Sequence, residues 1–130
     1  MIRICIDTNF YAAFKRGISE AVDLIEYAEE IIVPSIVLGE LYAGFFIGNR
    51  VKENISELHK FLDLPGVFVA DIDISIAERY GIIVKILRAN GTPIPTNDIW
   101  IAAITLEKGT RLATFDTHFR LVPGIFHIDI

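Results

Sequence analysis

Residues 31–49 read IIVPSIVLGELYAGFFIGN, a run of nineteen residues that contains no basic side chain and a single acid, Glu40. The run has the length of a membrane span, but a charged side chain at the centre of a bilayer costs about 2.5 kcal/mol or more. Pro34 divides the run, because proline is tolerated in the first turn of a helix and not in its interior. We therefore predict a short buried strand at 31–33, followed by a buried helix that Pro34 opens.

Short apolar strands alternate with helical segments along the rest of the chain. Further strands are predicted at 2–6, 67–70, 111–115 and 125–129, and helices at 20–29, 51–62, 75–89 and 97–107. The apolar spacing within the helix at 75–89 predicts that its inward residues are Ala77, Tyr80, Val84 and Leu87. Alternating strands and helices are typical of βαβ units, so the sequence predicts an α/β fold with a mostly parallel sheet of about five short strands.

Composition limits the compartment and the class of partner. The chain has 130 residues without repeats or linker-like segments, which predicts a single domain over residues 1–130. A net charge of −5 argues against simple attraction to nucleic acid or to an anionic membrane, unless a bound cation supplies positive charge. Cys5 is the only cysteine, and no secretory signal precedes it. We therefore expect a cytoplasmic protein that does not associate with membranes.

Four acids stand where predicted elements begin or end, or inside an apolar helix. Asp7 follows the first strand, Asp116 follows the strand at 111–115, and Asp98 opens the helix at 97–107. Each of these three is also explained by an ordinary turn or helix-capping role. Glu40 is different, because a buried lone carboxylate costs several kcal/mol unless it is paired or bound to a metal. A buried salt bridge is the alternative for Glu40, although no Lys or Arg lies within one helical turn of it.

These acids can meet, because ligands of parallel sheets bind beyond the carboxyl ends of the strands. Clustered carboxylates raise one another's pKa and destabilise an empty site. Oxygen ligands without Cys or His select hard cations, so the pattern predicts one or two Mg²⁺ or Mn²⁺ ions held by Asp7, Glu40, Asp98 and Asp116. The three histidines are scattered along the chain, which argues against zinc.

Four motifs carry a resemblance to a known family: ICIDTN at 4–9, GELYAG at 39–44, TNDIWIAA at 96–103 and LATFDTHF at 112–119. In this order and at these separations, the chain resembles a PIN-domain ribonuclease of the VapC type, the toxins of bacterial and archaeal toxin–antitoxin modules. The resemblance implies a three-layer α/β/α sandwich around the parallel sheet. It also implies that Asp7, Glu40, Asp98 and Asp116 are the catalytic metal-site acids, supported by the polar residues Asn9, Thr114 and Thr8.

The resemblance implies an activity and two protein partners. The activity is metal-dependent hydrolysis of RNA phosphodiester bonds by an activated water, which leaves a 5′-phosphate and a 3′-hydroxyl. The protein partners are a cognate antitoxin, whose basic residue could enter the acidic site, and a second copy of the chain in a homodimer. The aromatic residues at 10–14 and 42–46 are too numerous for one buried helix face, so some are expected to line a groove for a partner helix.

Substrate contacts and rival functions remain open at the level of sequence. Candidate contacts with RNA are Lys15, Arg16, Arg50, Lys52 and His118, for which ordinary solvated surface residues are the alternative. A Mg²⁺-dependent phosphatase would also place an Asp after its first strand, but it usually carries a second acid at the position of Asn9. A non-catalytic PIN-like module that binds RNA or protein is the other rival, and the presence of all four acids argues against it.

Overall fold

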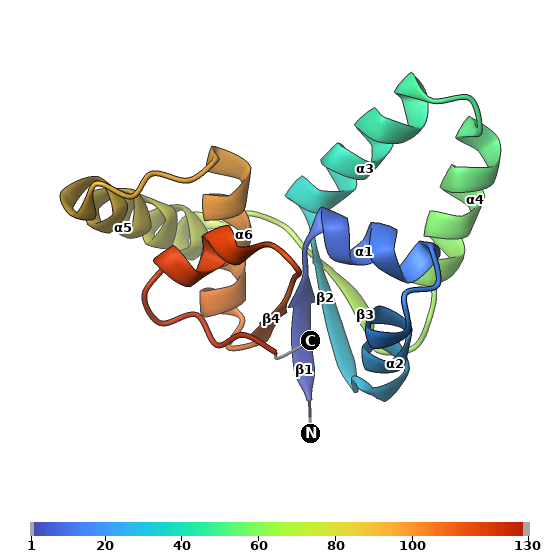
Figure 1. Ribbon diagram of the computed structural model, residues 1–130, viewed down its shortest axis with the longest axis horizontal. Helices are drawn as coiled ribbons and strands as arrows, with labels where there is room; N and C mark the ends of the chain where they lie inside the picture. Colours follow the sequence, from blue (N-terminus) through green and yellow to red (C-terminus); the bar gives the residue numbers. More distant parts are fainter. Residues whose placement is uncertain (1, 129–130) are drawn as a thin grey trace.

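Four parallel strands form one sheet in the computed structural model, which describes residues 2–128, and their order is β3–β2–β1–β4 (Figure 1). The strands are β1 (Arg3–Ile6), β2 (Glu30–Pro34), β3 (Val67–Ala70) and β4 (Arg111–Ala113). The two central strands, β1 and β2, are buried over nearly their whole length, as expected for a parallel sheet that is covered on both faces. The predicted α/β fold and parallel sheet are confirmed.

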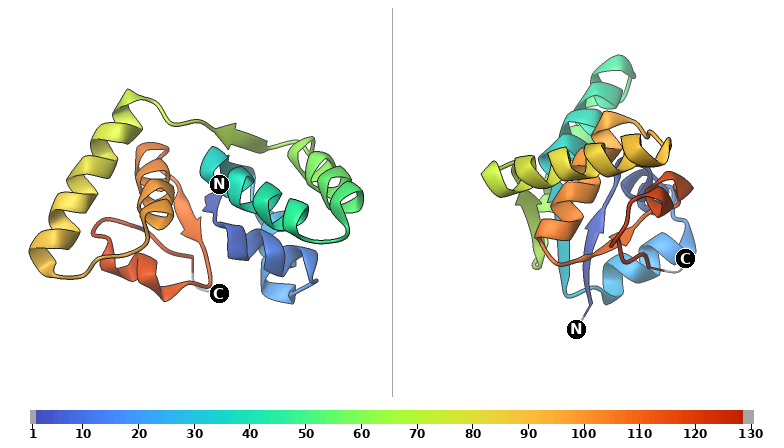
Figure 2. Two further views of the ribbon diagram at one scale, coloured as in Figure 1. Left: turned by 90° about the horizontal axis from the view of Figure 1, so that it is seen from above. Right: turned by 90° about the vertical axis from the view of Figure 1, so that its left-hand side faces the viewer.

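Each connection between strands contains two helices. These are α1 (Thr8–Lys15) and α2 (Ser19–Tyr27), then α3 (Ser35–Ile47) and α4 (Val51–Leu62), then α5 (Ile74–Asn90) and α6 (Thr96–Glu107). The first two connections run in one direction along the sheet, and the third returns to the other side of β1. Right-handed crossovers therefore put α1 to α4 on one face and α5 with α6 on the other, and Figures 1 and 2 show these three layers.

The prediction of a last strand at 125–129 is wrong for residues 125–128, and residue 129 lies outside the described range. A short 3₁₀ helix, η1 (Thr117–Leu121), follows β4, and the chain then turns back beside it. Only an isolated bridge between Leu112 and His127 forms, with backbone hydrogen bonds from Leu112 to Phe126 and from Ile128 to Leu112. These two bonds are too few to make a fifth strand, so the sheet has four strands within residues 2–128.

The predicted inward face of α5 is confirmed at Leu87, which is buried, and at Tyr80 and Val84, which are half-buried against the core, and it is wrong at Ala77. The buried residues are Ile76, Ile83 and Leu87, whereas Ala77 is exposed. Ile76, Ile83 and Leu87 also follow helical spacing, and burying isoleucine removes more apolar surface from water than burying alanine. Gly91 ends the helix in the left-handed conformation.

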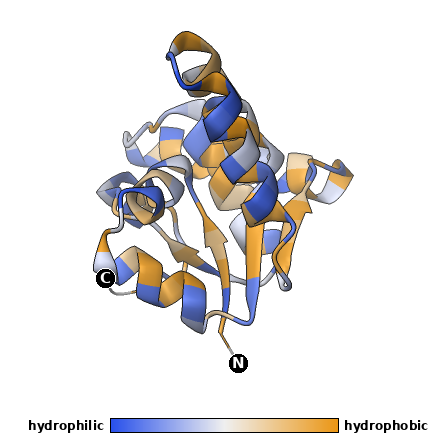
Figure 3. Cartoon of the chain, turned by 90° about the vertical axis from the view of Figure 1, so that its right-hand side faces the viewer, coloured by the Kyte–Doolittle hydropathy of each residue, from blue (hydrophilic) through white to orange (hydrophobic). Residues whose placement is uncertain are grey.

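The apolar run at 31–49 folds as strand β2 and helix α3, as predicted, but most of α3 is not buried. Only Val37 and Leu41 are fully buried in it, while Phe46 is 65% and Ile47 is 88% exposed. The reason is that α3 and α4 extend beyond the sheet as a projecting pair (Figure 1), on which Figure 3 shows hydrophobic residues. No described helix is both long enough and apolar enough to cross a membrane.

A turn at Gly66 fixes where β3 enters the sheet. Its carbonyl accepts a hydrogen bond of 2.8 Å from the Ile31 N–H, and its φ angle is 84°. A Cβ atom at this position would lie 2.5 Å from the backbone oxygen of Glu29. Gly91 also has a positive φ, of 67°, but nothing lies within 4 Å of a Cβ built there. Comparing alanine substitutions at the two glycines therefore distinguishes the cost of a positive φ angle from the cost of a steric clash.

We expect Gly91→Ala to lower the free energy of unfolding by about 1–2 kcal/mol, the strain of a left-handed alanine. Gly66→Ala adds an overlap with a backbone atom that cannot move without disturbing the pairing of β2 with β3, so its loss should be clearly larger. Urea denaturation of both variants at one pH measures the difference. Equal losses would contradict the close approach at Gly66.

Candidate active site

The four acids singled out in the sequence surround one small hollow at the carboxyl edge of the sheet. Its volume is about 90 Å³, and its lining residues are Asp7, Thr8, Asn9, Glu40, Asp98, Ile101 and Asp116. The connections on the two sides of β1 run over opposite faces of the sheet, and such a reversal opens a crevice at this edge. The fold thus brings together acids from four separate elements of the sequence.

Asp7 is held at the end of β1 by two hydrogen bonds. The register pairs Ile6 with Ala113, so the next residues, Asp7 and Thr114, lie side by side. The Thr114 hydroxyl donates to one carboxylate oxygen of Asp7, and the Phe10 N–H donates to the other at 2.8 Å. Asp7 is only 4% exposed and also caps the N-terminus of α1. Asp7 therefore both caps helix α1 and belongs to the acidic cluster.

Glu40 points into the same hollow from α3 and is half-buried. It accepts a hydrogen bond of 2.8 Å from the hydroxyl of Thr8. No Lys or Arg among residues 2–128 forms an ion pair with it, so the alternative of a buried salt bridge is wrong for this part of the chain. Thr8 is the supporting residue that touches Glu40, while Asn9 lines the hollow from an exposed position.

Asp98 and Asp116 form a second part of the cluster, together with His118. One ligand atom from each of these three side chains lies within 4.8 Å of the others. Nδ1 of His118 is 3.0 Å from an oxygen of Asp116, and the His118 N–H donates to that carboxylate at 2.8 Å. The N–H of Asp116 donates to the Thr114 hydroxyl at 2.9 Å, so Thr114 connects Asp116 to Asp7. His118, predicted as a substrate contact, lies beside the acids.

Burial and mutual repulsion disfavour full ionisation of the cluster. Burial first, and then the charges of Asp116, Glu40 and Asp7, raise the pKa of Asp98 to about 6, against a smaller opposing effect of His118. Burial also raises the pKa of Asp7, although the hydrogen bonds from Thr114 and Phe10 oppose this shift. Additional positive charge would relieve the repulsion, and a set of carboxylate oxygens fits a hard divalent cation.

The other predicted substrate contacts do not join this hollow. Lys15 forms an ion pair of 3.3 Å with Glu57, and with Arg16 it lines a separate groove between α1, α3 and α4. Arg50 caps the start of α4, and Lys52 lies in the first turn of that helix, at the far end of the projecting pair (Figure 1). None of these four side chains therefore lines the hollow of the acids.

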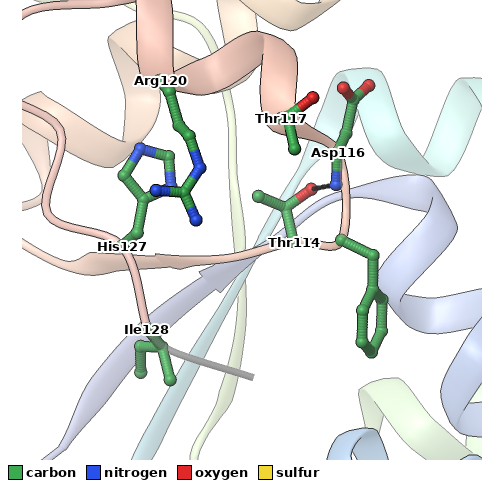
Figure 4. A pocket seen from close by; sticks show the side chains of 7 residues that line it. Thr114, Asp116, Thr117, Arg120, His127 and Ile128 are labelled. Atoms are coloured by element: carbon green, nitrogen blue, oxygen red, sulfur yellow. Dashed lines mark hydrogen bonds between the residues drawn. The ribbon is translucent and has the colours of Figure 1, made fainter.

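Two basic side chains that the sequence analysis did not select lie beside Asp116. Arg120 and His127 line a larger hollow, of about 270 Å³, which Asp116 also lines (Figure 4). The position of Arg120, four residues after Asp116 in the segment that follows β4, is a signal that could have identified it. No local sequence pattern identifies His127, because it lines this hollow only through the return of the chain beside β4.

Known proteins resemble the chain in sequence. The sequence model of the PIN domain family matches residues 4–125. Ribonuclease VapC4 of Mycobacterium tuberculosis is 28% identical over 98 residues, which are 75% of each protein.

Two solved structures resemble the fold over nearly its whole length. One is VapBC2 from Rickettsia felis bound to a DNA fragment from its promoter, with a TM-score of 0.86, 24% identity and coverage of 100% of this chain and 99% of that one. The other is DNA-bound VapBC from Salmonella typhimurium, with a TM-score of 0.82, 27% identity and coverage of 99% and 98%.

The raised pKa of Asp98 predicts a local dependence of stability on pH. The carboxyl gains its proton near pH 6 in the folded chain and near pH 3.8 when it is unfolded, so the folded state binds more protons between these values. This contribution to stability therefore rises as the pH falls through that window. In chelator at pH 7, Asp98→Asn should be more stable than the native protein by about 1 kcal/mol, a figure reduced for solvent screening.

Thermal or urea denaturation in EDTA at pH 7 and near pH 4 measures this effect, because the difference should nearly vanish at the lower pH. The same charge change at Asp71, an exposed acid outside the hollow, separates the local effect from the removal of one negative charge. A native protein at least as stable as Asp98→Asn at pH 7 would contradict the repulsion among these acids.

Proposed function

The chain belongs to the PIN domain family, and from this premise we propose that it is a divalent-metal-dependent endoribonuclease, the toxin of a toxin–antitoxin pair. The observation that carries the proposal is the gathering of Asp7, Glu40, Asp98 and Asp116 around one hollow. No Lys or Arg among residues 2–128 forms an ion pair with any of these acids. The relative named Ribonuclease VapC4 supports the same class of reaction.

The four acids are proposed to hold one or two Mg²⁺ or Mn²⁺ ions. All four are carboxylates at one sheet edge, which is the donor chemistry that these hard cations prefer. When bound, a divalent cation lowers the pKa of a water nucleophile and offsets negative charge that develops on the phosphate. Positive charge at this edge would also let a chain with a net charge of −5 accept RNA.

The chain's own side chains orient the ligands and the water. Thr114 and the Phe10 N–H fix the carboxylate of Asp7, and Thr8 fixes that of Glu40, so these acids are assigned mainly to binding the cation. Asp116, which His118 holds from the solvent side, is assigned to a second cation or to orienting the attacking water. Attack by water, and not by the 2′-hydroxyl, gives a 5′-phosphate and a 3′-hydroxyl.

The two rival functions fit the site less well. A phosphatase of the Asp-based class would need a second acid at the position of Asn9 and a lysine near the phosphate. The hollow contains Asn9 and no lysine among its described lining residues. A module that only binds RNA or protein would have no need for four converging acids, whose repulsion disfavours folding.

The ribonuclease proposal predicts that cleavage depends on a divalent cation and on the acids. With Mg²⁺ or Mn²⁺, the purified protein should cut single-stranded RNA internally and leave ends that carry a 5′-phosphate. Asp98→Asn should lower the cleavage rate by about 100-fold or more, whereas Asp71→Asn, at an exposed acid outside the hollow, should leave it unchanged. Sequencing of the cleaved RNA ends and gel assays measure both effects.

Sustained cleavage in excess EDTA would overturn the mechanism. The melting temperature with and without Mn²⁺ separates a nuclease from a module without a metal site. The native protein should be stabilised by the ion, and Asp98→Asn should be stabilised less.

The groove between α1, α3 and α4 is proposed to hold the antitoxin. Its volume is about 200 Å³, and it is lined by Tyr11, Ala12, Lys15, Arg16, Leu41, Phe45, Asn54 and Glu57. This mixture of aromatic, aliphatic and charged residues suits the apolar face of an amphipathic segment with a polar rim. The solved VapBC structures support an antitoxin as the partner.

A homodimer is also proposed, for which β3 and the start of α5 offer the exposed apolar residues Phe68, Val69, Ile72 and Ile74.

Filling the groove should weaken antitoxin binding without changing cleavage. Ala12→Arg introduces a long side chain into the groove, and Ala77→Arg makes the same change on the exposed face of α5. With a cognate antitoxin as titrant, calorimetry should show at least about tenfold weaker binding for Ala12→Arg only. Equal affinities of both variants would place the antitoxin elsewhere.

A further inference from the structure

The hollow beside Asp116 combines an arginine, a histidine and two threonines with the single carboxylate of Asp116, whereas the adjoining acidic hollow is lined by four carboxylates. Its volume is about 270 Å³, and its lining residues are Thr114, Phe115, Asp116, Thr117, Arg120, His127 and Ile128. Figure 4 shows Arg120 and His127 at one end of it, with Thr117 and Asp116 at the other. Three different segments therefore build its walls, namely the residues 114–116 that follow β4, the helix η1, and the returning chain at 127–128.

Arg120 is available to a ligand in this hollow. It is exposed and forms no ion pair with any residue in the range 2–128, whereas Arg3, Lys15 and Arg79 are each paired with a glutamate. A guanidinium presents a planar fork of N–H donors that matches the oxygens of a phosphate. Thr117 is also exposed and lines the same hollow, and its side chain carries a hydroxyl that can donate a hydrogen bond.

The two hollows are neighbours, because Asp116 lines both of them. Thr114, which also lines the larger hollow, donates its hydroxyl proton to Asp7 in the acidic cluster. A polynucleotide that lies across the acids can therefore continue directly into the hollow of Arg120. The acidic side of this boundary repels an RNA backbone unless a cation is bound, whereas the Arg120 side attracts it.

We propose that the hollow lined by Arg120, Thr117 and His127 binds the backbone phosphate of a nucleotide that flanks the scissile bond, with Arg120 as its main ligand. The inference rests on the proposed function for the identity of the polymer as RNA. Binding one flanking phosphate here would hold the strand in register with the acids, which is positioning that a chain with few cations near its active site requires. Arg120 is thus a substrate-binding residue that does not touch the reacting atoms.

The test compares Arg120→Gln with Arg111→Gln. Arg111 is also exposed, but it begins β4 and therefore lies at the amino edge of the sheet, away from both hollows. Binding of a short fluorescein-labelled single-stranded RNA is followed by anisotropy in Ca²⁺, over a series of salt concentrations, with gels to verify that the RNA stays intact. Cleavage in Mg²⁺ and the melting temperature are measured on the same samples.

Arg120→Gln should weaken RNA binding by about fivefold to tenfold and lower the slope of log affinity against log salt by about 0.7, the value for one phosphate contact. It should raise KM with little change in kcat, since the contact is the same in the ground and transition states. Arg111→Gln should bind RNA with nearly native affinity and slope. Unchanged melting temperatures would show that the effect is not one of folding.

The outcomes separate this inference from the proposed function. If the native protein cleaves RNA but Arg120→Gln binds it with native affinity and slope, the subsite is overturned and the ribonuclease stands. If binding depends on Arg120 but no cleavage occurs in any divalent cation, the contact of Arg120 with an RNA phosphate stands and the ribonuclease falls. A native protein that neither binds nor cleaves RNA overturns both, and equal losses in the two arginine variants reduce the effect to general charge.

Discussion

The hydroxyl of Thr114 holds the centre of the acidic site together. It donates its proton to the carboxylate of Asp7 and accepts the N–H of Asp116 at 2.9 Å, so a single oxygen atom joins the end of β1 to the segment after β4. Without it, the buried carboxylate of Asp7 would retain only the hydrogen bond from the Phe10 N–H. The pairing of Ile6 with Ala113 puts the two side chains opposite each other, so the site depends directly on the register of the sheet.

The clustering of buried carboxylates lowers the free energy of unfolding at the place where the chemistry is proposed to occur. Burial, followed by the charges of the neighbouring carboxylates, raises the pKa of Asp98 to about 6, and burial raises the pKa of Asp7, so neither ionises as readily in the fold as in the unfolded chain. The apolar strands around Cys5 and Ile32, which lie opposite each other in the sheet, supply burial that offsets this repulsion. The apolar core thus stabilises the fold against the repulsion within the acidic site, although the core residues do not bind the cation.

The sequence predicts the elements and the acids, and it predicts their surroundings poorly. Asp7 and Asp116 could be identified because they follow apolar strands, and parallel strands end at a common edge. The contacts of Thr8 and Thr114 could only be expected by resemblance, because they depend on the sheet register and on the rotation of α3. The sequence predicts a buried Glu40, whereas the structure shows it half-buried, because the apolar composition of α3 does not indicate that the helix extends past the sheet. Arg120 and His127 come together through the return of the chain beside β4, which two backbone hydrogen bonds set and no local pattern encodes.

The projecting pair of α3 and α4 has a consequence for local motion. The fully buried residues of α3, Val37 and Leu41, both lie in the half nearer to β2, whereas Phe46 and Ile47 at the other end are largely exposed. Few buried apolar contacts hold that end, so we expect its backbone hydrogen bonds to open at a free-energy cost well below that of global unfolding. We therefore expect amide protons in the last turns of α3 to exchange with solvent much faster than those of β1. Glu40 stands one residue before Leu41, at the boundary between the stable half and the opening half of the helix.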